Sequence, residues 1–219
     1  MFDPLKLRHA LDVFPKKNIK DFNDFWIWKS QTENQDISIL DDEHIEATNI
    51  KLYEILNGWQ TYRNGKNNNP SKTLKISLKN MRADYDQIRK DTLLNFKNIS
   101  EFGLRMIWHE LGRVKEYEGE TNEGGDYFAV AVTKPFLLLW GQTLGFDTRV
   151  RRNLPRRLGL SAPDFRMGFS KWYGVMSSLS VELNESTEFI REAQKISKEL
   201  YGEDAVIPFG RYLDLYFWA

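Results

Sequence analysis

The chain has 219 residues, of which 41% are hydrophobic and 28% charged, so it is long enough to bury a core and too hydrophobic for a disordered chain. Its 31 basic and 31 acidic residues balance, which excludes a global field that attracts nucleic acid and leaves only a local basic surface. The lack of cysteine excludes disulfides, thiolate metal sites and cysteine nucleophiles. The three histidines, His9, His44 and His109, lack ligand spacing, which argues against a zinc site.

The chain carries no sign of a targeting or membrane segment. Residues 1–17 are mixed in polarity and contain no apolar core of signal-peptide length. No apolar run approaches the roughly 20 residues that a membrane span needs, and the longest candidate, 135–140, has the length of a core segment. The sequence therefore predicts a soluble, cytoplasmic protein, and we expect a monomer with no cofactor, no metal and no membrane partner.

Helical spacing of apolar residues begins near the N-terminus. Phe22, Phe25 and Trp26 are spaced i, i+3, i+4, so they fit one face of a helix. The acids at 41–43 favour the start of a second helix, because the helix dipole stabilises negative charge there. This second helix is expected to reach Trp59.

Two polar segments interrupt the predicted helices. Residues 64–71, dense in Asn and Gly, form the clearest break in the chain. This break either separates two lobes, 1–70 and 71–219, of a single compact helical protein, or is only an exposed loop. Residues 116–126 are acidic and rich in glycine, and they predict a surface loop.

Further helices are predicted along the second half of the chain. Residues 84–97 are amphipathic, and Ser100 is a good N-cap for the helix that follows. Weak alternation over 127–132 predicts a short strand, after which Thr133 is expected to cap a helix that Pro135 enters at its first turn. The remaining expected segments are helices at 147–158, 163–180 and 186–201 and an apolar stretch at 212–218. We predict an all-α fold with at least about seven helices and, at most, a minor strand pair.

One stretch, 140–160, combines an acid, glycines and a dense run of arginines. Asp147 follows a glycine-containing turn and opens a predicted helix. The arginines of this helix have no acid among them and repel one another unless they bind an anion, which favours a contact with phosphate over a solvated face with ion pairs. These arginines are Arg149, Arg151, Arg152, Arg156 and Arg157.

This stretch resembles the helix-hairpin-helix superfamily of DNA glycosylases. The family signature is an aromatic-Gly pair, a short turn, an apolar-Asp-Thr-His-Val segment and then Arg-Leu-Gly-Leu. The matching residues are Trp140-Gly141, Phe146-Asp147-Thr148 with Val150, and Arg157-Leu158-Gly159-Leu160, with Arg149 in place of the usual His. The resemblance covers residues 129–160 and implies a helical, two-lobed glycosylase-like architecture with double-stranded DNA as the partner.

The chain departs from the family in the hairpin. Its nearest counterparts are the pair Gly124 and Gly125 or the run 129–131. Hairpin glycines let backbone amides approach a phosphate, so Gly124, Gly125 and the nearby Lys134 are expected to contact DNA. Bifunctional members carry a Schiff-base lysine in the hairpin region, but Lys134 lies six residues before Trp140, too close to match it. The resemblance therefore implies a monofunctional enzyme that uses water.

Asp147 is the catalytic carboxylate that the resemblance implies. Breaking an N-glycosidic bond builds positive charge on the sugar, as in glycoside hydrolysis. A carboxylate beside that carbon stabilises the charge and can orient or deprotonate a water molecule. The alternative for Asp147 is a helix N-cap without chemistry, because Asp is a favoured capping residue.

Aromatic residues near the motif would stack on a flipped base, namely Trp140, Phe146, Trp172 and Tyr173. Packing in the core is the favoured alternative for Trp140, Trp172 and Tyr173. Asp214 is a lone acid in the apolar C-terminal stretch, and we expect it to bond Arg211 or a helix end.

The leading functional hypothesis is a DNA glycosylase that hydrolyses the N-glycosidic bond of a flipped, modified or damaged base and leaves an abasic site. A role in DNA repair and a role in defence against modified phage DNA fit equally. The alternatives are a catalytically silent nucleic-acid-binding protein of the same fold and a helical module whose arginines bind an acidic protein.

Overall fold

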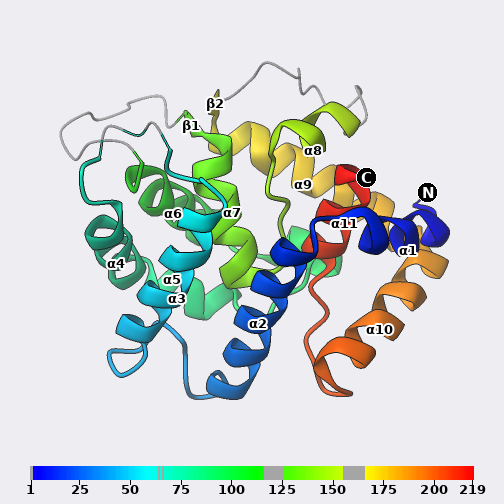
Figure 1. Cartoon of the computed structure of the whole chain (residues 1–219), viewed down its shortest axis with the longest axis horizontal. Helices are drawn as coiled ribbons and strands as arrows, with labels where there is room; N and C mark the ends of the chain where they lie inside the picture. The colour runs from blue at the N-terminus through cyan, green and yellow to red at the C-terminus, as the bar shows by residue number, and fades with distance from the viewer. Residues whose placement is uncertain (1, 64, 66, 116–125, 155–165) are drawn as a thin grey trace.

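A computed structural model of the chain describes residues 2–63, 65, 67–115, 126–154 and 166–219 (Figure 1). In these residues eleven α-helices, one 3-10 helix and two short strands are present. The helices of the first half are α1 (Pro4–Val13), α2 (Lys16–Thr32), α3 (Ile45–Gly58), α4 (Pro70–Asn80), α5 (Arg82–Ile88), η1 (Leu93–Asn98) and α6 (Glu101–Arg113). The second half contains β1 (Tyr127–Phe128), α7 (Ala129–Trp140), α8 (Thr148–Asn153), β2 (Arg166–Met167), α9 (Phe169–Asn184), α10 (Thr187–Tyr201) and α11 (Phe209–Trp218).

The all-α prediction is confirmed, with a single two-stranded antiparallel sheet formed by β1 and β2. Tyr127 is opposite Met167 in this sheet, and Phe128 is opposite Arg166. The predicted N-cap at Ser100 is also confirmed, because its Oγ accepts a hydrogen bond from Gly103 N at 3.2 Å. No helix within the described residues is long and apolar enough to cross a membrane.

The start of α7 differs from the prediction. Thr133 does not cap this helix, which begins four residues earlier, at Ala129, and its hydroxyl donates to Ala129 O at 2.7 Å from within the helix. Pro135 lies inside the helix instead of in its first turn. The helix is apolar on nearly every side and is buried along most of its length, so burial outweighs the strand preference of its valines.

A segment near 84–97, predicted to be one amphipathic stretch, is divided between α5 and η1. The indole of Trp140 holds the link between them, because its Nε1 donates to Ile88 O at 3.0 Å and to Asp91 O at 3.1 Å. Asn95 then has non-helical backbone angles within η1. The amphipathic pattern therefore located the buried side chains but not the break between the two helices.

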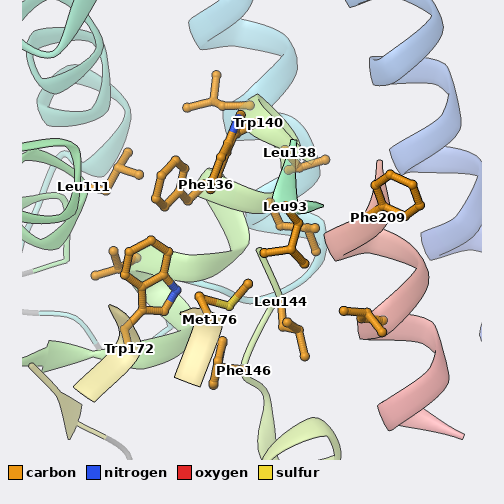
Figure 2. Packing of buried hydrophobic residues seen from close by; sticks show 14 of the residues in the cluster. Leu93, Leu111, Phe136, Leu138, Trp140, Leu144, Phe146, Trp172, Met176 and Phe209 are labelled. Carbon is orange, nitrogen blue, oxygen red and sulfur yellow. The ribbon is translucent and has the colours of Figure 1, made fainter. Parts of the chain in front are cut away.

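The core is built around α7. One hydrophobic cluster extends from Phe2 to Phe217, so it includes residues on both sides of the 64–71 break. Figure 2 shows Phe136 and Trp140 of α7 among the packed side chains, together with Trp172 and Met176 of α9. The Phe136 and Trp140 rings are stacked with their centroids 5.2 Å apart. This rigid centre carries the loop that leads from α7 to α8.

The C-terminal helix α11 closes the core beside the same loop. Arg211 N donates to Gly141 O at 3.1 Å, which ties the first turn of α11 to the end of α7. Gly210 lies so close that a Cβ there would overlap the backbone of Gln142 and Thr143. Helix α11 also packs against α1 and α8, so both ends of the chain lie on the same side of the molecule (Figure 1).

This close approach makes Gly210→Ala a destabilising change. We expect a loss of about 1–3 kcal/mol in the free energy of unfolding, because backbone atoms cannot yield as a flexible side chain does. The matched control is Gly174→Ala in α9, where an added Cβ meets nothing within 4 Å. That control is expected to gain up to about 1 kcal/mol from helix propensity. Urea unfolding of both variants measures the difference, and equal stabilities would contradict the close packing.

Candidate active site

Asp147 is the N-cap residue of α8. Its Oδ1 accepts hydrogen bonds from Arg149 N at 2.9 Å and from Val150 N at 3.0 Å. No hydrogen bond from the described residues reaches its Oδ2, and the side chain is half-buried. The capping alternative from the sequence is therefore real, but capping occupies one oxygen and leaves the other for a ligand.

The residue before Asp147 explains how the chain enters α8. Phe146 has a φ of 40°, in the left-handed region that a bulky side chain rarely adopts. Its ring is fully buried, and packing in the core offsets the cost of this conformation. The sharp turn sends the Phe146 ring inward and leaves Asp147 half-buried at the start of the helix.

Asp147 lines a narrow pocket that contains about 300 Å³ of empty volume, part of it open to solvent. Its walls come from distant parts of the chain, including the α1–α2 region, the end of α3, α7 and α11. The other lining residues are Phe14, Asn18, Trp59, Lys134, Leu137, Gly145, Arg211 and Asp214. The site thus places two carboxylates and two cations around one opening.

Asp214 is the second carboxylate of this pocket, and it is buried. Its Oδ1 accepts a hydrogen bond from Gly145 N at 2.7 Å, and its Oδ2 accepts one from Arg211 Nη1 at 2.9 Å. Burial raises the pKa of Asp214 to about 6, the Arg211 charge opposes this shift, and the nearby Asp147 charge adds to it. The predicted bond between Asp214 and Arg211 is confirmed.

Arg211 is the buried partner of this ion pair. Its guanidinium lies 4.8 Å from the ring centroids of Phe14 and Phe22. Burial lowers the pKa of Arg211, and the Asp214 charge counters that effect. The pair connects α11 to Gly145, two residues before Asp147, and so helps to fix the catalytic candidate in place.

Lys134 lies in the same pocket. Burial lowers the pKa of Lys134, and the charges of Asp147 and Asp214 oppose that shift. Its Nζ lies 3.5 Å from Trp59 O and 5.6 Å from the centroid of the Trp59 ring. Its spacing in the sequence did not match the lysine of the bifunctional family members, yet the amine shares the pocket of Asp147.

The arginines of α8 divide into two groups. Arg149 and Arg152 are exposed, and Arg149 stacks on the Trp218 ring at 4.2 Å. Arg151 is instead buried, and it donates from Nε to Asp147 O at 3.3 Å and from Nη2 to Thr148 Oγ1 at 3.4 Å. The other predicted DNA contacts, Arg156, Arg157, Gly124 and Gly125, lie outside the described residues.

None of the four predicted base-pocket aromatics lines this pocket. Trp140, Phe146 and Trp172 are fully buried in the core, and the Trp172 Nε1 donates to Thr143 Oγ1 at 3.0 Å. The core packing that the sequence left open for Trp140 and Trp172 is therefore what the structure shows, and Phe146 shares it. Tyr173 is half-buried and packs on Phe96, with centroids 5.0 Å apart.

Two aromatic residues that sequence reasoning missed line the pocket instead. Phe14 is the C-cap residue of α1, and Trp59 is that of α3. The Trp59 indole is oriented by a hydrogen bond from its Nε1 to Asp21 Oδ2 at 3.2 Å. Both residues are far from Asp147 in the sequence, so no local motif identifies them.

In the described part of the chain, no group of three or more acidic or histidine side chains is arranged to hold a metal ion. His109 is hydrogen-bonded to Tyr127, with Nδ1 and Oη 3.2 Å apart. The chemical groups of the candidate site are two carboxylates, an amine, a guanidinium and aromatic walls.

Comparisons with known proteins give no further guide, since no protein-family model, curated protein or solved structure matches the chain.

Proposed function

We propose that the protein is a monofunctional DNA glycosylase that removes a modified or damaged base from double-stranded DNA and leaves an abasic site. The observation that carries the proposal is the position of Asp147. It lines a pocket, its Oδ1 is fixed by two backbone amides, and exposed arginines of the same helix lie beside it. This combination suits a reaction that develops positive charge next to a DNA backbone.

The geometry supports the following sequence of events. The target nucleotide leaves the duplex, because its glycosidic bond is hidden in the base stack. Asp147 Oδ2 faces the sugar, stabilises the positive charge that develops as the bond breaks, and accepts a proton from the attacking water. The base departs with the bonding electron pair, and the water oxygen forms the new bond to the sugar.

The pocket is narrow, so it suits the attacking water better than a nucleotide, and the sugar would lie at its opening. Trp59 lies at one wall with its ring held by Asp21, and an aromatic ring in that position can stack on a flipped group. The identity of the base decides between a role in DNA repair and a role in defence against modified phage DNA. A panel of duplexes with different modified bases, followed by alkali cleavage of abasic sites, tests the proposal.

The exposed arginines of α8 give a second test. Replacing Arg149 and Arg152 together with Ala is expected to weaken binding to duplex DNA and to reduce its salt dependence by roughly two units in the slope of log K against log salt. The reason is that each lost phosphate contact releases about one fewer counterion. Fluorescence anisotropy at several salt concentrations measures the slope.

The matched control for this test replaces Lys79 and Lys97, two exposed cations of other elements, with Ala. Its net charge change equals that of the arginine variant, so a general charge effect would appear in both. An unchanged slope in the arginine variant, or an equal loss in the control, would contradict direct phosphate contact by Arg149 and Arg152.

A further inference from the structure

A second pocket adjoins the one that contains Asp147. Trp59 and Asp147 line the narrow pocket, and the residues that directly follow them, Gln60 and Thr148, line the second one. The second pocket is wider, with about 1100 Å³ of empty volume compared with about 300 Å³, in both cases partly open to solvent. The two openings therefore share a boundary formed by the end of α3 and the start of α8.

The side chains around the wider pocket are positively charged. Arg63 follows α3, Lys115 follows α6, and Arg151 belongs to α8, so three separate elements each supply a cation. Such a convergence brings several donors together in one concave site, which suits a polyanionic group better than scattered surface cations do.

Two of these cations are held in position by neighbouring groups. Arg151 is only 2% exposed, and its hydrogen bonds to Asp147 O and Thr148 Oγ1 fix the guanidinium at the boundary with the narrow pocket. Lys115 Nζ lies 4.4 Å from the centroid of the Phe128 ring, which also lines the pocket. A site whose cations are already ordered loses little side-chain entropy when it binds an anion.

The backbone turn after α3 positions Arg63, the third cation. Gln60 has a φ of 54°, which turns the chain sharply at the end of the helix. Its Oε1 then accepts a hydrogen bond from Arg63 Nη1 at 3.1 Å. Arg63 is otherwise exposed, so its guanidinium keeps donors for a ligand in the pocket.

We infer that this wider pocket binds a phosphodiester of the DNA strand, next to the nucleotide whose sugar faces Asp147. The inference rests on the proposed function, since that function places the sugar beside Asp147, at the opening of the narrow pocket. Phosphate suits the site because arginine forks bind its oxygens in pairs and a lysine adds a compact charge. Arg63 and Lys115 would thus act with the α8 arginines, although they lie far from the motif in the sequence.

Binding of a duplex that contains one tetrahydrofuran abasic analogue tests the inference without any need for catalysis. Arg63→Gln and Lys115→Gln are each expected to weaken binding roughly tenfold and to lower the salt slope by about one. Lys79→Gln, at an exposed lysine of α4, is the matched control and should leave both values unchanged. Circular dichroism on each variant verifies that the fold is intact.

A second measurement locates the contact on the DNA. A single phosphate near the analogue is replaced with a neutral methylphosphonate, one position at a time. At one position the methylphosphonate should weaken binding of the wild type but have little further effect on Arg63→Gln, because both changes remove the same contact. Additive effects at every position would overturn the inference.

Free inorganic phosphate presents the same kind of oxygen atoms to the wider pocket as a phosphodiester does. If inorganic phosphate binds the wild type and not Arg63→Gln, while both bind DNA equally, the pocket binds free phosphate and the inference is overturned. The proposed function fails separately, through a lack of base release on all modified duplexes. Arg63-dependent binding with no base release would support the phosphodiester site and refute the glycosylase.

Discussion

Asp147→Asn is expected to abolish base release, with a fall in the single-turnover rate of at least about 10²–10⁴-fold. The substitution removes the negative charge that would stabilise the developing sugar cation and accept a proton from water. It also keeps an oxygen that can accept the hydrogen bonds from Arg149 N and Val150 N. Asn is as good an N-cap as Asp, so the change isolates charge from capping.

Binding to a duplex with a flipped or abasic analogue should change little in this variant, because the arginines remain. Asp204→Asn, at an exposed acid outside the pocket, is the matched control and should release base at the wild-type rate. Single-turnover assays with alkali cleavage measure the rates. Full activity in Asp147→Asn would remove this carboxylate from the mechanism and leave it as a helix cap alone.

Asp214→Ala is expected to lower the free energy of unfolding by about 3–5 kcal/mol. The change leaves the buried Arg211 without its charge partner and removes the acceptor for Gly145 N. For a chain of this size the loss corresponds to a fall in melting temperature of roughly 6–20 °C. Thermal and urea unfolding measure both quantities.

Two further variants test whether the loss of stability comes from the buried unpaired charge. Asp204→Ala removes an exposed acid and should cost less than about 0.5 kcal/mol. The double variant Arg211→Met with Asp214→Leu replaces the pair by apolar groups and should recover much of the loss, because no unpaired charge remains buried. A cost below about 1 kcal/mol for Asp214→Ala would contradict the role of the pair in fixing α11 to the loop before Asp147.

The periodicity of apolar residues predicted most of the fold correctly. The helix over 187–201 and the buried face of Phe22, Phe25 and Trp26 match the predicted segments because each has one apolar side. The start of α7 was misplaced because its buried valines and threonine resemble a strand followed by a cap. The segment is helical because α7 is buried at the centre of the core, and a local sequence pattern does not reveal that position.

The candidate site could be predicted from the sequence only in part. Asp147 could be singled out because capping residues, turn glycines and arginines are adjacent in the sequence. Phe14 and Trp59 could not, because α1 and α3 are far from Asp147 in the sequence and meet it only in the folded chain. The wider basic pocket could not either, because the ends of α3 and α6 meet α8 only in the folded chain. Asp214 gave a usable signal, since a lone acid in an apolar stretch requires a buried partner.

Lys134 shows the limit of reasoning from spacing alone. Its distance along the chain from Trp140 argued against a nucleophilic role, yet its amine lies in the pocket of Asp147. Because water is the proposed nucleophile, borohydride should trap no covalent adduct with DNA. An adduct that disappears in Lys134→Gln would replace water with this amine.

The most direct test of the glycosylase proposal is mass spectrometry of modified duplexes after incubation with the purified protein. The proposal predicts that one strand loses the mass of a base and gains that of water, with the free base in solution and the backbone intact. The same reaction with Asp147→Asn should leave the strand unchanged. Intact strands with the wild type across all modified bases, despite tight binding, would contradict the proposal and identify a DNA-binding protein without this activity.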